Sequence, residues 1–167
     1  MKIPIGAGGY YWPGTRGVYM YRQPPLYNSR QLLIHEAMHQ FHYLARCKNV
    51  SPKDTWYIEG IVENFSRHYW DGEKIELAVI PFCSLANYPK LALDLFSRED
   101  YELAGMINGD RASARPEQWA LVRYLLEADA GKYRKAWALL AKKLDGGQSG
   151  RTVFKQVGGD PQRLPPN

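Results

Sequence analysis

The stretch Ile34-His35-Glu36-Ala37-Met38-His39-Gln40-Phe41 decides how this chain is organised. It lies inside a run from about Asn28 to Arg46 that predicts a helix, because its apolar residues recur at helical spacing. Helix positions four apart differ by roughly 400° and about 6 Å, so His35 and His39 leave one face, one turn apart. Two such imidazoles can hold one Zn²⁺, and the adjacent Glu36 can take a proton from a metal-bound water. The pattern also recurs by chance in unrelated helices, so it needs a second feature beside it.

That second feature is Trp56-Tyr57-Ile58-Glu59-Gly60-Ile61-Val62-Glu63, which offers carboxylates one helix further along the chain. We predict a helix over about 55–70 that contains it. Glu59 and Glu63 are four residues apart and therefore share a face. A glycine inside a helix costs roughly 1 kcal/mol relative to alanine. We therefore expect Gly60 to let this helix approach the metal-binding helix closely.

Length and composition indicate one domain over residues 1–167, large enough to bury a core. No apolar run approaches the ~20 residues that a membrane-spanning helix needs. The net charge of +5 raises nucleic-acid binding as a third class of function. However, the basic residues are scattered, and their densest group, at 132–143, alternates with apolar residues as on a solvated helix face. We therefore expect no nucleic-acid partner.

The N-terminal sequence lacks the apolar core of a signal peptide. The chain begins in mid-pattern, so we leave open that it is part of a longer protein, in which case an extracytoplasmic location is favoured. Cys47 and Cys83 are neither a disulfide framework nor a metal site. They can pair with each other or remain two buried thiols.

The remaining elements predict a mostly helical α+β fold. Residues 1–16 are typical of loop or irregular strand, and the segment Gly17 to Arg22 reads as a strand between glycine and two prolines. We expect this strand to form a small N-terminal sheet or hairpin against the metal-binding helix. Five further helices are predicted over 85–96, 97–107, 117–128, 132–144 and 151–157.

The two motifs together resemble those of a known family. The residues His35-Glu36-Ala37-Met38-His39, with Glu59 after 19 intervening residues, are similar to the gluzincin metallopeptidases. The likeness is greatest to bacterial peptidase-MA-like proteins, whose pattern is H-E-x-x-H-Q … W-x-x-E-G-x-A-E. The segments 9–11 and 17–19 resemble the strand region before the metal helix of that family. The segment 118–125 resembles its later helix, so the likeness extends over most of the chain.

The resemblance implies a zinc-dependent peptidase that acts on a polypeptide. His35 and His39 would bind zinc through imidazole nitrogens, and Glu59 would be the third ligand. Such a set leaves the ion an open position, as catalytic zinc sites require. Glu36 would be the general base that deprotonates zinc-bound water for attack on the peptide carbonyl. Glu63 is either a partner for the second nitrogen of a ligating histidine or an exposed helical glutamate.

The chain departs from the family pattern in two places. The family usually carries a tyrosine at the start of the later helix, where its hydroxyl stabilises the tetrahedral oxyanion, and Arg115 stands there in this chain. A guanidinium can do the same work, or it can point to solvent. Aminopeptidases of this clan need a carboxylate before the metal helix, and residues 1–35 contain neither aspartate nor glutamate. This favours an endopeptidase over an aminopeptidase.

The intact Glu36 favours an enzyme, whereas the missing tyrosine favours an alternative. That alternative is a zinc-binding interaction domain of the same fold with weak or lost catalysis.

Overall fold

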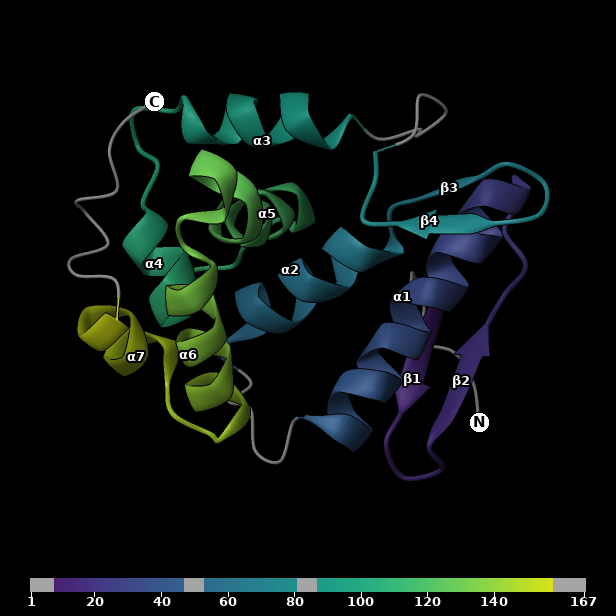
Figure 1. The fold of residues 1–167 in the computed structure, drawn as a ribbon, viewed down its shortest axis with the longest axis horizontal. Helices are drawn as coiled ribbons and strands as arrows, with labels where there is room; N and C mark the ends of the chain where they lie inside the picture. Colours follow the sequence, from purple (N-terminus) through teal and green to yellow (C-terminus); the bar gives the residue numbers. More distant parts are fainter. Residues whose placement is uncertain (1–7, 47–52, 81–86, 158–167) are drawn as a thin grey trace. The chain divides into compact units, whose positions relative to one another are not determined.

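The structure is a computed structural model that describes residues 8–46, 53–80 and 87–157, with the side chains of 154–157 left out (Figure 1). Over these described residues the chain forms seven helices and two antiparallel two-stranded sheets. The predicted fold class, α+β and mostly α, is therefore confirmed. None of the described helices is both long and apolar enough to cross a membrane.

The chain divides into two compact units. One contains residues 1–46 and 62–85, and the other contains residues 47–61 and 86–167. The boundary falls inside helix α2 (Thr55–Ser66), so this one continuous helix contributes its first half to the second unit and its last turn to the first.

The first unit is built on helix α1 (Leu26–Ala45), which carries the two candidate histidine ligands. An antiparallel hairpin of β1 (Gly9–Trp12) and β2 (Gly17–Met20) packs along this helix, as Figure 1 shows. Tyr10 and Tyr19 are cross-strand partners whose rings stack with centroids 5.4 Å apart, which stabilises the hairpin. The predicted N-terminal hairpin and the strand beginning at Gly17 are confirmed.

Helix α1 begins at Leu26, two residues before the predicted start. Pro25 precedes it in an extended conformation, and proline is well suited to a helix start because its fixed φ and missing N–H cost nothing there. Neither Asn28 nor Ser29 caps the helix, since both lie within its first turn. The Ser29 hydroxyl instead accepts from the Gln23 N–H at 2.8 Å and donates to the Gln23 carbonyl at 3.1 Å.

The second helix was predicted to continue to residue 70, and this is wrong. α2 ends at Ser66, and the chain then forms a hairpin of β3 (His68–Trp70) and β4 (Ile75–Leu77). Two aromatic residues at 69 and 70 favour a strand. The Asp71 carboxylate closes the turn by accepting from the N–H groups of Glu73 and Lys74, at 2.8 and 2.7 Å. Asp71 thereby stabilises the turn of this hairpin, which stands where the last turn of the helix was predicted.

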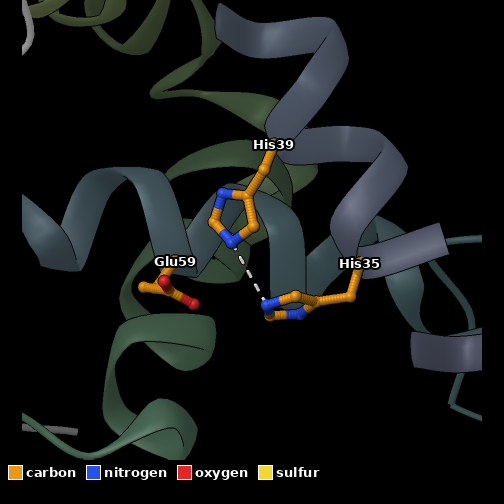
Figure 2. Close-up of side chains that lie close together, drawn as sticks. All are labelled: His35, His39 and Glu59. Carbon is orange, nitrogen blue, oxygen red and sulfur yellow. Dashed lines mark hydrogen bonds between the residues drawn. The ribbon is translucent and has the colours of Figure 1, made fainter. Parts of the chain in front are cut away.

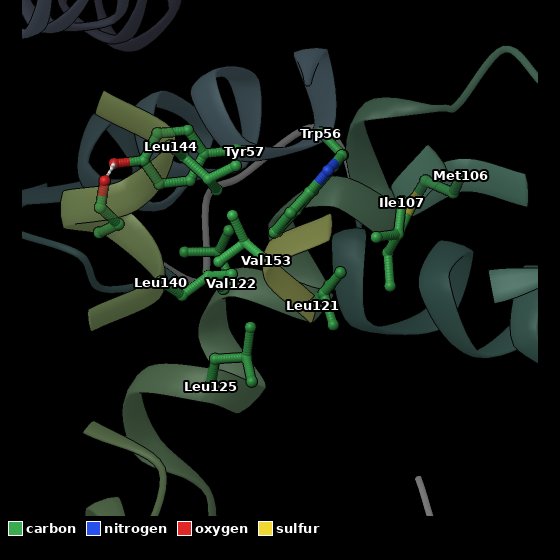
Figure 3. Close-up of a cluster of buried hydrophobic side chains, with 11 residues drawn as sticks. Trp56, Tyr57, Met106, Ile107, Leu121, Val122, Leu125, Leu140, Leu144 and Val153 are labelled. Atoms are coloured by element: carbon green, nitrogen blue, oxygen red, sulfur yellow. Dashed lines mark hydrogen bonds between the residues drawn. The ribbon is translucent and has the colours of Figure 1, made fainter. Parts of the chain in front are cut away.

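The second unit contains the helices of the C-terminal half: α3 (Tyr88–Phe96), α4 (Leu103–Asn108), α5 (Arg115–Gly131), α6 (Arg134–Asp145) and α7 (Gly150–Val157). The buried apolar side chains of α4, α5, α6 and α7 form one core with the start of α2, drawn in Figure 3. Trp56 and Tyr57 of α2 are fully buried in it, and the Tyr57 hydroxyl donates to the Asp145 carboxylate at 2.8 Å. The core therefore holds the first turns of α2 firmly within this unit.

The helix predicted over 97–107 starts later than expected. Ser97 ends α3 instead of beginning the next helix, because its N–H donates to the Leu93 carbonyl at 2.9 Å. The chain then turns through residues 98–102 before α4 begins at Leu103. A serine can occupy either end of a helix, and here Ser97 is the C-cap of the preceding helix, α3.

Gly60 in α2 does allow a close approach, but the neighbouring helix is α5 and not the expected α1. A Cβ built on Gly60 would lie 2.5 Å from a Val122 methyl group and 2.6 Å from the Gln118 carbonyl oxygen. The second of these atoms is helix backbone and cannot rotate away. Gly60 therefore sets the distance between α2 and α5 within the second unit.

This close approach predicts that Gly60→Ala destabilises the protein. The substitution gains about 1 kcal/mol of helix propensity, but overpacking against a helix backbone typically costs 1–3 kcal/mol. Gly105→Ala is the matched control, because Gly105 lies inside α4 and its added Cβ would make only ordinary contacts, the nearest at 3.4 Å. We expect the unfolding free energy of Gly60→Ala to fall about 2 kcal/mol below that of Gly105→Ala in urea titrations. Equal values for the two variants would contradict the close packing.

Candidate metal centre

His35 and His39 lie one turn apart on α1 and their ring nitrogens converge. The two Nε2 atoms are 3.2 Å apart, and the ring planes meet at 79° (Figure 2). His35 is buried, whereas His39 is partly exposed. Two imidazole nitrogens this close together can both bind one metal ion when each is free of hydrogen.

Glu59 on α2 completes a group of three ligand types. One ligand atom from each of His35, His39 and Glu59 lies within 4.8 Å of the others, and Figure 2 shows the carboxylate beside the two rings. Among the described residues this is the group of histidine and acidic side chains whose atoms are close enough for a metal ion. The group could therefore hold a metal ion.

Glu63, one turn after Glu59 on the same helix, contacts the other nitrogen of His35. Its Oε1 atom lies 3.3 Å from His35 Nδ1, while its Oε2 atom accepts from Arg67 Nη2 at 2.8 Å. The three side chains are almost completely buried, with 6%, 3% and 4% of the side chain exposed for His35, Glu63 and Arg67. A carboxylate at Nδ1 favours the tautomer of His35 that leaves Nε2 free of hydrogen, which is the form that binds a metal.

Arg115 is the first residue of α5 and lies beside Glu59. Its Nη1 atom is 3.3 Å from Glu59 Oε2, with 52% of the arginine side chain and 27% of the glutamate side chain exposed. The guanidinium thus contacts the carboxylate of a candidate ligand. Its exposure leaves it accessible to a molecule that approaches Glu59.

Glu36 is buried in α1 directly after His35. It is not one of the three residues of the candidate ligand group.

The donor set fits a zinc ion. Two neutral imidazoles and one carboxylate are ligands of the kind that catalytic zinc sites use, and they leave a position for water or substrate. A closed structural site would instead use mostly cysteine thiolates. The same nitrogen and oxygen donors also accept other divalent ions.

The fully buried His68 has a different role. Its Nδ1 atom lies 3.0 Å from the Ser66 carbonyl oxygen, so this nitrogen carries the hydrogen and donates it, and Arg30 Nε donates to Nε2 at 3.4 Å. Its ring also stacks on Tyr27 at 4.6 Å. Burial lowers the pKa of His68 below its usual value, which agrees with a neutral ring. Both nitrogens are occupied, so His68 is structural.

Arg67 was not predicted from the sequence as a residue of the site. The one signal that could have found it is its spacing, since it follows Glu63 by four residues in a segment predicted to be helical. Cys47 and Cys83 lie outside the described residues.

Comparison of this chain with known protein families, with curated proteins and with solved structures finds no match.

Proposed function

We propose that this chain is a zinc-dependent peptidase of the gluzincin type, similar to the peptidase-MA-like proteins, that cleaves within a polypeptide. The observation that carries the proposal is the convergence of donor atoms from His35, His39 and Glu59 within 4.8 Å. The sequence pattern that spans these residues supports it, because the family resemblance and the geometry select the same three side chains.

In this proposal each residue has a defined task. His35, His39 and Glu59 hold the zinc ion, which when bound polarises the scissile carbonyl and lowers the pKa of water. Glu63 orients the His35 ring through Nδ1. Glu36, a buried residue that directly follows His35 in the sequence, accepts a proton from the attacking water and returns it to the leaving amine.

Arg115 supplies positive charge at the position where the related enzymes use a tyrosine hydroxyl. Its contact with Glu59 at 3.3 Å places the guanidinium near the ligand group, and its exposure lets it turn toward a substrate. A guanidinium can stabilise the developing oxyanion with a full charge. The absence of any acidic residue in positions 1–35 supports an endopeptidase, because no carboxylate there can bind the free amine of a substrate.

A second candidate function is a zinc-binding interaction domain with little or no catalysis. The observation that favours it is the same Arg115 contact, since a guanidinium held by Glu59 is less available to a reacting carbonyl. The two functions share the metal centre and differ only in whether Glu36 and Arg115 act on a substrate.

Hydrolysis that depends on zinc tests the proposal directly. The zinc-loaded chain is incubated with a mixture of unstructured polypeptides, and new amino termini are counted by mass spectrometry. We expect internal cleavages that stop when a chelator removes the metal and return when zinc is added back. Zinc binding at one ion per chain without any cleavage would overturn the peptidase and support the interaction domain.

A further inference from the structure

We infer that Arg67 is a positioning residue of the metal centre, acting on the zinc ligand His35 through Glu63. The inference rests on the metal site of the proposed function and does not require that the chain cleave peptides. It concerns a residue that the sequence motif does not include, since Arg67 follows the last motif position by four residues.

The contacts form a continuous chain from the ligand outward. Arg67 Nη2 donates to Glu63 Oε2 at 2.8 Å, and the other oxygen of the same carboxylate lies 3.3 Å from His35 Nδ1. The remaining nitrogen of that imidazole, Nε2, faces His39 Nε2 at 3.2 Å. Each of the first three side chains therefore contacts the next through a separate pair of atoms.

Because these contacts are buried, losing one of them should affect the metal ligand. The side chains of Arg67 and Glu63 are 4% and 3% exposed, so water cannot replace either partner. A buried carboxylate that loses its cation is strongly destabilised, because desolvation is no longer offset by the ion pair. The carboxylate would then turn or exchange partners to recover hydrogen bonds, and its hold on His35 would be lost.

The geometry of arginine suits this role better than that of lysine. The guanidinium is planar, permanently charged and weakly hydrated, so it can be buried and still present its donors in a fixed direction. Arg67 directly follows Ser66, the last residue of α2, and is four residues after Glu63. Because residues four apart on a helix lie on the same face, the backbone also restricts the positions that the Arg67 side chain can take. The pair thus fixes the carboxylate in the orientation that His35 needs.

Arg30 provides a matched control in the same unit. It is also an arginine on the first unit, but it contacts His68 and lies over the Trp70 ring at 5.8 Å. Arg30→Met removes the same charge and the same donors without touching the Glu63 carboxylate. A general effect of losing an arginine from this unit would therefore appear in both variants.

The test is the metal affinity of the full chain, measured by competition for Zn²⁺ with a chromophoric chelator, with visible spectra of the Co²⁺ form beside it. We expect Arg67→Met to weaken zinc binding by about tenfold or more, in the range found for residues that orient metal ligands. The Co²⁺ bands should shift, because an imidazole that turns changes the ligand field. Arg67→Lys should recover part of the affinity, and Arg30→Met should bind within about twofold of the unsubstituted chain.

A double substitution shows whether Arg67 acts through Glu63. If it does, Glu63→Gln combined with Arg67→Met loses no more affinity than Glu63→Gln alone, because the connection is already broken. Losses that multiply, an unchanged affinity in Arg67→Met, or an equal loss in Arg30→Met would each overturn the inference.

Should Arg67→Met fail to fold, the lysine variant carries the test. We then expect about threefold weaker zinc binding in Arg67→Lys that disappears in the Glu63→Gln background. The same loss in both backgrounds, or no loss in either, would overturn the inference. An unsubstituted chain that binds no zinc overturns it together with the proposed function, whereas a chain that binds zinc and cleaves nothing overturns the peptidase alone.

Discussion

A chain carrying Glu36→Gln is expected to bind one zinc ion and to hydrolyse peptides at least about 100-fold more slowly. Glu36 is buried next to His35 but is not one of the three candidate ligands, so its charge can be removed without removing a donor to the metal. Glutamine keeps the size of the side chain and cannot accept the proton of the attacking water. Loss of a general base typically costs about 10²–10⁴-fold in rate. The measurement is the rate of peptide cleavage beside the zinc content of the same sample.

Glu76→Gln is the control for this substitution. Glu76 lies in β4 and is exposed, so the same chemical change there should leave both zinc content and cleavage unaltered. Unchanged cleavage in Glu36→Gln would remove Glu36 from the mechanism. Loss of zinc in that variant would instead mean that Glu36 contributes to the metal site itself.

His39→Ala is expected to remove the metal. The substitution deletes one of three donor groups and leaves a single imidazole and a carboxylate, too few to hold an ion firmly. Replacing a residue that only orients a ligand already costs 10–100-fold in affinity, so we expect a loss of more than about 100-fold here. Elemental analysis of the purified protein should give about one zinc per chain before the substitution and none after it.

His42→Ala is a stringent control, because His42 is also buried in α1 and lies only three residues further along. It is not part of the candidate ligand group, so its removal should leave the metal in place. If neither the unsubstituted chain nor His39→Ala contains metal after zinc is added, His35 and His39 are ordinary interior side chains. The proposed function would then lose its basis.

The two substitutions together separate the candidate functions. Zinc that depends on His39, with cleavage that depends on Glu36, is the pattern of a peptidase. Zinc that depends on His39, without cleavage in any variant, is the pattern of the interaction domain. In that case the contact between Arg115 and Glu59 becomes the first place to look for the loss of catalysis.

Features governed by a regular local repeat could be predicted from the sequence. The four-residue spacing predicted that His35 and His39 share a face of α1, and their Nε2 atoms are 3.2 Å apart. The glycine and proline boundaries around residues 17–22 predicted the strand that became β2. Both follow from φ and ψ preferences within a few residues, so no distant contact was needed to infer them.

Other features were decided by contacts between segments far apart in the chain. From helix propensity alone, the second helix was predicted to continue to residue 70. In the structure residues 68–70 instead form a strand, because they pair with residues 75–77. Gly60 marked a close approach, and only the packed structure shows that α5 is the neighbouring helix. A glycine in a helix indicates that another segment can approach closely, but the sequence does not identify that segment.

The metal centre combines both kinds of information. Helical periodicity alone put His35 with His39, and Glu59 with Glu63, in pairs one turn apart. The tertiary structure decided that Glu63 meets His35 Nδ1 and that Arg67 holds the second oxygen of that carboxylate. The physical reason is burial: in a nearly dry interior each charged atom must find a partner, and the packing of α1 against the last turn of α2 selects which partner it finds.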